Sequence, residues 1–170
     1  MTTDHLDEQW DLYDAALQVV GTQRRGDPMP AGRFHLTVAA VLFDENGHVL
    51  LQRRSRAKLN HPDEWEVSAG GSALRGEDGL AAIHREVQEE LGLALAFTAA
   101  NRFAQVSHAT WIEQWFVATV STALRATVHR QTSEVQTIEW LPLATAQARL
   151  QAQGHADYAA QLAAAAAWLK

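Results

Sequence analysis

The chain has 170 residues, a length that suits one domain and buries a sizeable core without covalent staples. Its 14 Lys and Arg residues against 20 Asp and Glu residues give a net charge of −6, which argues against a general DNA or RNA binder with a clustered basic face. The sequence contains no cysteine, which excludes disulfides, cysteine metal ligands and thiol catalysis and fits a reducing compartment.

The start of the chain lacks the features of a targeting segment. Residues 1–5 are polar and acidic, unlike a signal peptide, and the sequence has no run of 18 apolar residues that could cross a membrane. We therefore expect a cytoplasmic protein with no membrane partner and no nucleic-acid partner.

Two short apolar segments open the predicted fold. Residues 10–13 and 19–22 lie on either side of Asp14 and could pair as a small hairpin within residues 8–24. The Pro- and Gly-rich stretch 21–32 is too short to separate domains and is typical of a single loop.

The next segment predicts a longer hairpin. Residues 34–43 form a run rich in strand-forming residues, and residues 49–52 form a shorter apolar run. Asn46-Gly47 between them is a strong hairpin signal, because both residues tolerate a positive φ.

A strand and a helix follow this hairpin. Residues 65–69 predict a strand that ends at two glycines. Residues 79–91 predict a helix, and Gly92 is well placed to end it. The helix prediction rests on apolar side chains that recur at spacings of three and four residues, namely Leu80, Ile83, Val87 and Leu91.

The last third of the chain predicts more strands and then helices. Two strands with a turn near His108 are expected within residues 101–121, and a final strand is expected over residues 135–141. Residues 144–153 and 156–170 predict helices, the second of them rich in alanine. Strands separated by helices, together with antiparallel hairpins, predict a mixed α/β (α+β) architecture.

We expect one domain over residues 1–170. It would consist of an N-terminal hairpin at about residues 8–24, a core at about residues 33–141 and C-terminal helices at about residues 143–170. The alanine-rich last helix could pack on its own domain or on a second subunit, in which case the protein would be a homodimer.

Three carboxylates gather on one side of the helix predicted over residues 79–91. At about 100° per residue, Glu86, Glu89 and Glu90 fall within a sector of about 100° that flanks the apolar stripe. Like charges at these spacings repel, so the helix gains from the crowding only if a cation lies among them. Oxygen ligands favour a hard divalent ion, Mg²⁺ or Mn²⁺, which commonly bridges to a diphosphate. The alternative is a solvated acidic face, which is common on helices.

The residues around these glutamates favour a site. Gly70 and Gly71 end a strand just before a loop, where bare backbone can approach a ligand. Arg85 lies four residues before Glu89 and eight residues after Glu77, so its guanidinium could hold both carboxylates in a fixed orientation.

The segment from Gly71 to Leu93 resembles the Nudix box, G-x5-E-x7-R-E-U-x-E-E-x-G-U, in which U is a bulky apolar residue. Seven positions of this pattern are fixed residue types, so a chance match is on the order of 10⁻⁷ per chain. The order of strands and hairpins from Phe34 to Leu141 also resembles the family. The residues that fill all nine specified positions are Gly71, Glu77, Arg85, Glu86, Val87, Glu89, Glu90, Gly92 and Leu93.

The resemblance implies a mixed sheet between helices and an enzyme that hydrolyses a nucleoside diphosphate linked to a further group. Divalent metal ions would neutralise the diphosphate and lower the pKa of a bound water. By position in the box, the three helix glutamates would bind the metal, and a carbonyl of Gly70 or Gly71 would add a ligand. Arg85 and Glu77 would be the orienting pair.

The resemblance leaves the general base open. It could be the box residue Glu86 or a carboxylate on a later loop, for which Glu113, Glu134 and Glu139 are the candidates. Glu134 precedes the last predicted strand, where a mobile loop could deliver it, and is preferred among the three. Each of them could also be an ordinary surface carboxylate.

The N-terminal half carries a second resemblance. Residues 8–14, and the stretch QRRSRAKLNHPDEW at residues 52–65, resemble Nudix proteins related to type I isopentenyl diphosphate isomerase. That isomerase works with a cysteine and a glutamate, whereas this chain has no cysteine and carries an intact box, so a hydrolase is favoured over an isomerase. A third alternative is a non-catalytic domain that senses a nucleotide, although such domains often lose box glutamates.

Other side chains could meet the substrate. Arg53, Arg54 and Lys58 belong to a basic cluster beside the predicted site and could contact phosphates, or could be a solvated strand end. His35 and His61 lie near the site in sequence order and could bind a metal, although a lone histidine is more often structural.

Two tryptophans alternate with Glu113 along one predicted strand. Trp111 and Trp115 could stack on a nucleobase, although packing in a core or a dimer is the more frequent role of such residues. The substrate stays open among a nucleoside di- or triphosphate, a nucleotide sugar and a prenyl diphosphate.

Overall fold

The computed structural model describes residues 5–170. The prediction made for the polar start of the chain rests mainly on residues 1–4, which lie outside the described residues. In chain order the elements are β1 (Gln9–Tyr13), β2 (Val19–Arg24), β3 (His35–Asp44), β4 (His48–Arg54), β5 (Trp65–Glu66), β6 (Ala69–Ser72), α1 (Gly79–Leu91), the 3-10 turn η1 (Ala99–Asn101), β7 (Arg102–Ser107), β8 (Trp111–Val120), α2 (Thr122–Arg125), β9 (Val135–Pro142), α3 (Leu143–Ala152) and α4 (Ala156–Trp168).

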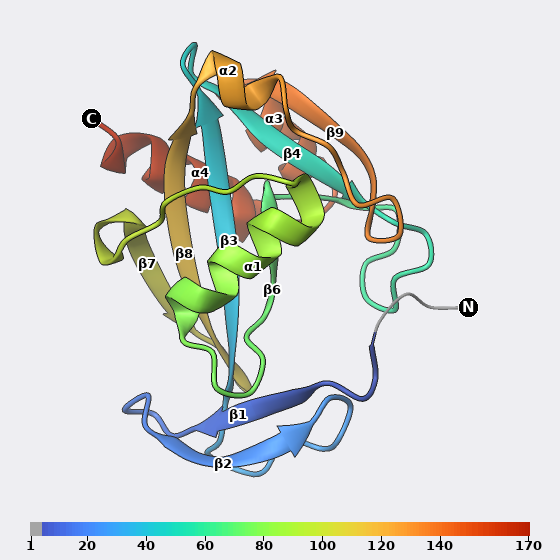
Figure 1. Ribbon diagram of the computed structural model, residues 1–170, viewed down its shortest axis with the longest axis vertical. Coiled ribbons are helices and arrows are strands. Elements are labelled where there is room, and N and C mark those ends of the chain that lie inside the picture. Colours follow the sequence, from blue (N-terminus) through green and yellow to red (C-terminus); the bar gives the residue numbers. More distant parts are fainter. Residues whose placement is uncertain (1–4) are drawn as a thin grey trace.

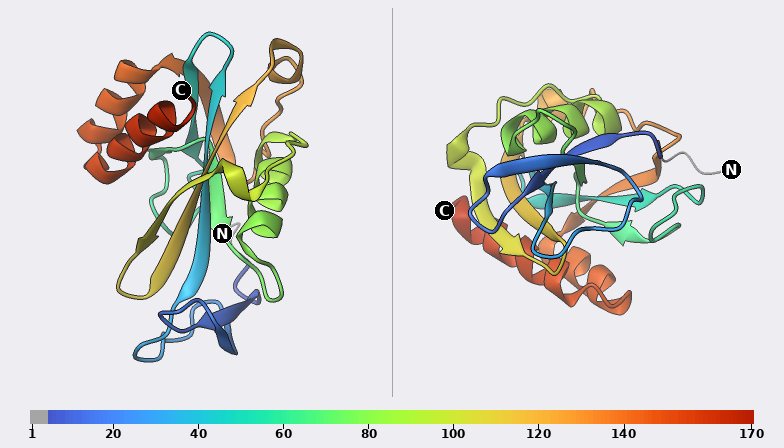
Figure 2. Two further views of the ribbon diagram at one scale, coloured as in Figure 1. Left: turned by 90° about the vertical axis from the view of Figure 1, so that its left-hand side faces the viewer. Right: turned by 90° about the horizontal axis from the view of Figure 1, so that it is seen from below.

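A mixed sheet lies between helices, with α1 on one face and α3 and α4 on the other (Figures 1 and 2). Its main strand order is β5-β4-β3-β8-β7, with β6 paired to β3 and β9 paired to β4. The β3–β8 pair is parallel, and the other pairs in this sheet are antiparallel. The predicted α+β fold, with a mixed sheet between helices, is confirmed.

Strand β3 is buried on both faces because it supplies two hydrophobic cores. Its side chains point alternately to opposite faces of the sheet, as in any strand. Leu36, Val38 and the following alternate residues pack with the apolar stripe of α1. Val41 and its alternate neighbours pack with α3 and α4. The continuous apolar run is typical of a strand covered on both sides.

Strands β3 and β4 separate soon after their connecting turn. They share a single residue pair, Phe43 with Val49, after which β4 pairs with β9 and β5. The buried Ser68 hydroxyl fills the split, because it accepts a hydrogen bond from the Leu42 N–H at 2.8 Å and donates one to the Leu50 carbonyl at 2.7 Å.

This split corrects one sequence prediction. The strand predicted over residues 65–69 is interrupted, since its first two residues belong to β5 on β4 and its last residue opens β6 on β3. Ser68 lies at the crossing, where its side chain replaces ladder hydrogen bonds between β3 and β4. Residue type alone does not show such a change of partner.

The turn between β3 and β4 forms where it was predicted but with a different geometry. Of Asn46 and Gly47, only Gly47 has a positive φ, of 78°. The Gly47 N–H donates to the Asp44 carbonyl at 3.0 Å, and the Asp44 carboxylate accepts from two further backbone N–H groups. This pattern matches a type I turn followed by a left-handed glycine rather than a two-residue turn with two positive φ angles.

The predicted N-terminal hairpin is present as the antiparallel pair β1–β2, drawn in blue in Figure 1. It docks on the loop that precedes α1. The Arg75 N–H donates to the Gln9 carbonyl at 2.8 Å, and the Gly76 N–H donates to the Asp11 carboxylate at 2.8 Å. These contacts fix the hairpin against the segment that carries the Nudix-box pattern.

The C-terminal helices pack on their own sheet. Leu150 of α3 and Leu162 of α4 are fully buried in the second core, together with three alanines. The alanine-rich helix therefore covers this domain, and a homodimer stays a prediction. The short helix α2 was not anticipated from the sequence. Within residues 5–170, every helix is too short or too polar to cross a membrane.

Candidate active site

Helix α1 begins and ends where its sequence signals place it. Asp78 is the N-cap, and its carboxylate accepts a hydrogen bond from the Ala81 N–H at 2.8 Å. Gly92 ends the helix in the left-handed conformation with φ 66°. The buried side of α1 includes Glu86 and Glu90 as well as its apolar stripe. The carboxylates predicted to flank that stripe are thus partly turned toward the sheet.

The two glycines of β6 allow close approaches that a side chain would block. A Cβ atom at Gly71 would overlap the carboxylate of Glu86, and one at Gly70 would lie 2.6 Å from the Val38 carbonyl oxygen. The Gly70 N–H donates to Glu90 Oε2 at 3.1 Å. Gly71 therefore leaves space for the carboxylate of Glu86, and Gly70 allows β6 to approach the backbone of β3 closely.

The charges of Glu86 and Glu90 are poorly compensated by the protein. Burial raises the pKa of Glu86 to about 7, and the nearby Arg85 offsets this only in part. Burial also raises the pKa of Glu90 well above its ordinary value, and the charges of Glu86 and Glu66 add to the effect. Two buried carboxylates beside a glycine backbone form an oxygen-only donor set, which suits a hard divalent cation such as Mg²⁺ or Mn²⁺.

Arg85 connects the box loop to the helix. Its guanidinium donates to both carboxylate oxygens of Glu77, at 2.8 and 3.0 Å, and to the Ser72 carbonyl at 2.9 Å. It also reaches Glu86 at 2.9 Å and Glu89 at 3.2 Å. The predicted contacts of Arg85 with Glu77 and Glu89 are therefore present in the structure.

The same network shifts the pKa values of its members. Burial alone would raise the pKa of Glu77, but hydrogen bonds from Arg85 and from the Leu74 N–H hold it below its ordinary value. Burial alone would lower the pKa of Arg85, but Glu77 and Glu86 raise it. Both groups are therefore charged, and their bidentate pair fixes α1 relative to the loop that precedes it.

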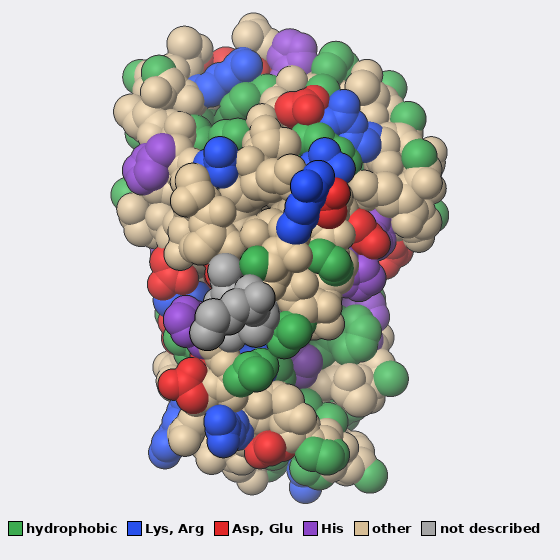
Figure 3. Space-filling view, turned by 90° about the vertical axis from the view of Figure 1, so that its right-hand side faces the viewer, with side chains coloured by type: hydrophobic (Ala, Val, Ile, Leu, Met, Phe, Trp, Pro, Cys, Tyr) green, Lys and Arg blue, Asp and Glu red, His purple; other side chains and the backbone are tan. Residues whose placement is uncertain are grey.

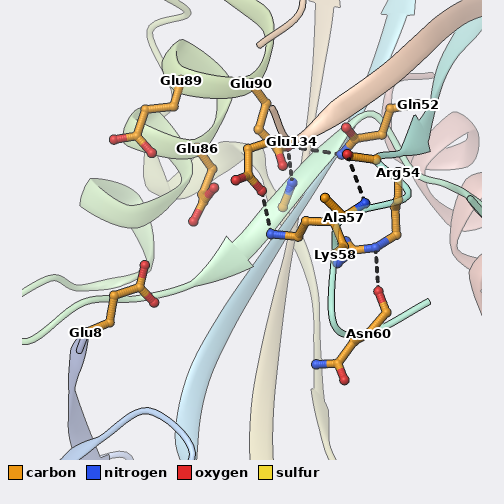
Figure 4. Close-up of polar contacts among 12 residues, drawn as sticks. Glu8, Gln52, Arg54, Ala57, Lys58, Asn60, Glu86, Glu89, Glu90 and Glu134 are labelled. Carbon is orange, nitrogen blue, oxygen red and sulfur yellow. Dashed lines mark hydrogen bonds and ion pairs between the residues drawn. The ribbon is translucent and has the colours of Figure 1, made fainter. Parts of the chain in front are cut away.

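The three glutamates of α1 line a cavity of about 450 Å³, and Figure 4 shows their side chains facing the space that Glu134 and Glu8 also face. Its walls come from the N-terminal hairpin, from β3, β6 and β8, and from the loop after β4. Lys and Arg side chains lie close to Asp and Glu side chains on the face drawn in Figure 3, and histidines are scattered over it. Other lining residues include Trp10, Arg25, His35, Arg54, Lys58, His61, Glu66, Trp111, Glu113 and Tyr158.

The predicted basic cluster divides between the cavity and the outer surface. Among the described residues, Arg54 and Lys58 line the cavity, whereas Arg53 does not. Arg53 turns to Asp63 instead, 3.1 Å from its carboxylate, and Arg56 contacts the same residue at 3.3 Å. Neighbouring residues of a strand point to opposite faces, which separates Arg53 from Arg54. The structure thus does not bring Arg53 to the predicted substrate position.

The three later candidates for the general base differ in whether they line the cavity. Glu134 lines the cavity and pairs with Lys58 (Figure 4). Glu113 lines it as well, but its carboxylate accepts a hydrogen bond from the Trp115 indole at 3.0 Å, and burial raises its pKa. Glu139 lies outside the lining of the cavity, among the described residues, and pairs with Arg149 at 2.8 Å.

The tryptophans and histidines singled out from the sequence have different surroundings. Trp115 is buried in the second core, and Trp111 lines the cavity and stacks on His108. His35 stacks on Trp10 with ring centroids 4.3 Å apart, and burial lowers its pKa to about 4. Trp111 and His35 thus belong to the cavity wall, while Trp115 has a packing role.

Some residues that shape the cavity were not assigned a role from the sequence. Gln52 is buried and donates to Glu90 Oε2 at 3.0 Å. Glu66 pairs with Arg54 at 2.8 Å, and Tyr158 reaches the cavity from the distant helix α4. The position of Gln52 directly after the apolar run 49–51 was the available signal for this residue, whereas Tyr158 carries no such signal.

A family model for the NUDIX domain matches residues 33–162. The chain belongs to the Nudix family. The family predicted from the box is therefore confirmed, and the matched segment contains α1, β6 and most of the cavity wall.

Relatives and solved structures agree with this membership. An uncharacterised Nudix hydrolase of Listeria monocytogenes is 36% identical over 65% of this chain and 66% of its own length, so the match spans just under two thirds of that relative. An isopentenyl-diphosphate Delta-isomerase of Nocardia farcinica is 30% identical over 84% of both chains. The crystal structure of DR0079 from Deinococcus radiodurans superposes with a TM-score of 0.75 and 26% identity, covering 93% of this chain and 99% of that one.

Proposed function

We propose that this Nudix protein hydrolyses a diphosphate linkage in a nucleoside diphosphate derivative or a related small phosphoanhydride, with Mg²⁺ or Mn²⁺ as cofactor. The observation that carries the proposal is the pair of buried, crowded carboxylates, Glu86 and Glu90, against the glycine backbone of β6. The protein bears the cost of burying these charges unless a cation compensates them. The Nudix hydrolase relatives support an enzyme that acts on phosphoanhydrides.

The residues that would hold the ion are Glu86, Glu89 and Glu90, with a backbone carbonyl of Gly70 as a further ligand. When bound, the ion would neutralise the diphosphate and make a coordinated water more acidic. Arg85 and Glu77 serve this set indirectly, because their bidentate pair fixes the start of α1 and the orientation of Glu86.

The protein supplies the remaining steps from the cavity wall. Lys58 and Arg54 would contact the phosphates, and the hairpin residues Trp10 and Arg25 would enclose the group attached to the diphosphate. Water attacks phosphorus, the bond from phosphorus to the bridging oxygen breaks, and a carboxylate accepts the proton of the water. Glu134 is our preferred acceptor, because it lines the same cavity from a separate loop; Glu86 is the alternative.

An isomerase is the second candidate function, because several relatives carry that name. The cysteine used by the isomerase pattern is absent from this chain, and Ala69-Gly70-Gly71 occupies the corresponding stretch. Since allylic proton transfer needs a group that these residues do not offer, hydrolysis is the better supported reaction. A nucleotide sensor is the third candidate, and it would bind without turnover.

The deciding experiment is a screen of diphosphate compounds with Mg²⁺ and with Mn²⁺. The panel contains nucleoside di- and triphosphates, nucleotide sugars and isopentenyl diphosphate, and the measurements are released phosphate or pyrophosphate and the formation of the allylic isomer. We expect hydrolysis of at least one compound, reduced more than about 100-fold in Glu89→Gln, whose exposed side chain can change without disturbing the core.

Glu139→Gln is the matched control, because Glu139 is also a partly exposed glutamate paired with an arginine but does not line the cavity. This variant should retain full activity. Isomerisation without phosphate release would refute the hydrolase in favour of the isomerase. Tight nucleotide binding without any turnover would refute it in favour of the sensor.

A further inference from the structure

A second group of metal-ligating side chains lies outside the glutamates of α1. It consists of His61, Glu64 and His155, whose ligand atoms all lie within 4.8 Å of one another. Glu64 Oε2 is 3.0 Å from His61 Nδ1 and 2.7 Å from His155 Nε2. Two imidazoles therefore converge on one carboxylate oxygen, although the first two residues are more than 90 positions from the third in sequence.

The two segments that carry these residues are fastened together by the neighbouring side chain of Gln153. Its amide nitrogen donates to the Trp65 carbonyl at 2.9 Å, and its amide oxygen accepts from the Trp65 N–H at 2.9 Å. This bidentate contact places Glu64 next to the start of α4. His155 is the N-cap residue of α4 and stacks on Tyr158, with ring centroids 5.6 Å apart. The positions of Glu64 and His155 are thus set by the fold before any ligand binds.

We propose that His61, Glu64 and His155 bind a transition-metal ion, with Zn²⁺ the best match. Two imidazole nitrogens and one carboxylate oxygen form a common zinc donor set, whereas the oxygen-only set on α1 suits a harder ion. Tetrahedral zinc with bonds of about 2.0 Å needs ligand atoms about 3.3 Å apart. The distances of 3.0 and 2.7 Å from Glu64 Oε2 to the two imidazoles are within about 0.6 Å of that value. The His61 side chain is 64% exposed, so solvent leaves it room to rotate into place.

Three protein ligands leave one coordination position for water or an external ligand. The cluster lines a second cavity of about 180 Å³, to which Arg54, Glu113 and Tyr158 also contribute. Arg54 and His61 line the large cavity as well, so the two spaces adjoin. An ion at this position would therefore present a positive charge beside the substrate cavity and would take an oxygen or nitrogen donor from a small molecule. The site itself does not depend on the reaction proposed for α1.

The test uses Co²⁺ as a spectroscopic substitute for Zn²⁺. The full chain is freed of metal with a chelator, supplied with excess Mg²⁺ to occupy the oxygen ligands of α1, and titrated with Co²⁺. We expect visible absorption bands of a low-coordinate Co²⁺ complex that saturate at one equivalent and disappear when Zn²⁺ is added. Competition with a zinc-sensitive dye then gives the affinity.

Variants assign the bands to the cluster. Loss of an outer-shell partner of a metal site weakens binding by up to about 100-fold, and loss of a direct ligand should cost more. His155→Ala and His61→Ala should therefore each weaken Zn²⁺ binding more than about 100-fold. His61 lies on the surface, so its variant keeps the proposal testable even if His155→Ala unfolds. His48→Ala is the matched control, because His48 also lies beside a carboxylate, Asp44, but outside the cluster.

Glu89→Gln separates this site from the proposed catalytic site. It should reduce phosphate release more than about 100-fold yet leave the Co²⁺ bands unchanged. If wild-type protein gives no bands, or if bands persist in both His61→Ala and His155→Ala, the proposed zinc site is wrong, whatever the outcome of the hydrolase assay.

Discussion

Glutamine at position 86 should make the metal-free protein more stable. Burial raises the pKa of Glu86 from 4.5 to about 7, and its neighbour Glu89 adds to the shift. One pKa unit corresponds to about 1.4 kcal/mol, so the ionised carboxylate costs the fold about 3 kcal/mol at pH 8. Glutamine has nearly the same shape and no charge, and it can still accept the hydrogen bond from Arg85. Glu86→Gln should therefore raise the free energy of unfolding by about 3 kcal/mol at pH 8.

The pH dependence of this difference follows from its sign. A carboxyl group whose folded pKa is raised binds its proton more tightly in the folded state than in the unfolded state. The wild-type protein therefore loses stability as the pH rises from about 4.5 to about 7, whereas Glu86→Gln lacks this loss. The two proteins should converge near pH 4.5 and differ most above pH 7.

The measurement is thermal or urea unfolding in the presence of a chelator, at several pH values between 5 and 8. For a chain of this size, about 3 kcal/mol corresponds to a rise in Tm of roughly 6–12 °C. Glu89→Gln is the matched control, because the Glu89 side chain is 51% exposed and its replacement should change stability by less than about 0.5 kcal/mol. A Glu86→Gln protein that is less stable than wild type at pH 8, or a difference that does not vary with pH, would refute the reasoning.

Two further predictions concern the walls of the cavity. Gly71→Ala should lower the rate of phosphate release at least about tenfold, because the added Cβ overlaps the Glu86 carboxylate and displaces this proposed metal ligand. The far-ultraviolet circular dichroism spectrum should stay the same. Unchanged turnover would contradict a role for the close contact between Gly71 and Glu86. Burial lowers the pKa of His35 to about 4, so the folded protein keeps this imidazole neutral and should lose up to about 3 kcal/mol of stability as the pH falls from 6.5 to 4. Thermal unfolding of His35→Phe, which keeps a ring against Trp10, should show a smaller loss over this pH range, and an equal loss would show that another group is responsible.

Local signals were sufficient to predict helix α1 and the side of it that carries the glutamates. The apolar stripe, the position of Gly92 and the fixed spacing of the box lie within one continuous segment, and the helix forms over the predicted residues 79–91. Contacts between Arg85 and Glu77 also follow from spacing, because a helix turn and a short loop bring them together. The identity of the metal and the roles of these residues stay predictions.

Features that depend on distant contacts were not predictable in this way. The interruption of the strand at residues 65–69 arises because Ser68 bonds to two other strands. The direction of the Arg53 side chain depends on which face of the sheet this position of β4 points to, and on the position of Asp63 in the following loop. Tyr158 enters the cavity only because α4 folds back over the sheet, a placement that local sequence does not encode.

The docking of the β1–β2 hairpin has an evolutionary consequence. Trp10 of β1 lines the cavity from a two-stranded sheet that is separate from the sheet on which α1 packs, and Glu8 and Arg25 line it from positions next to the strands of this hairpin. The proposed metal ligands and this part of the cavity wall are thus encoded in different stretches of the gene. Under the proposed function, a duplicated copy could acquire a new substrate by changes in the hairpin alone, with the residues proposed for hydrolysis unchanged.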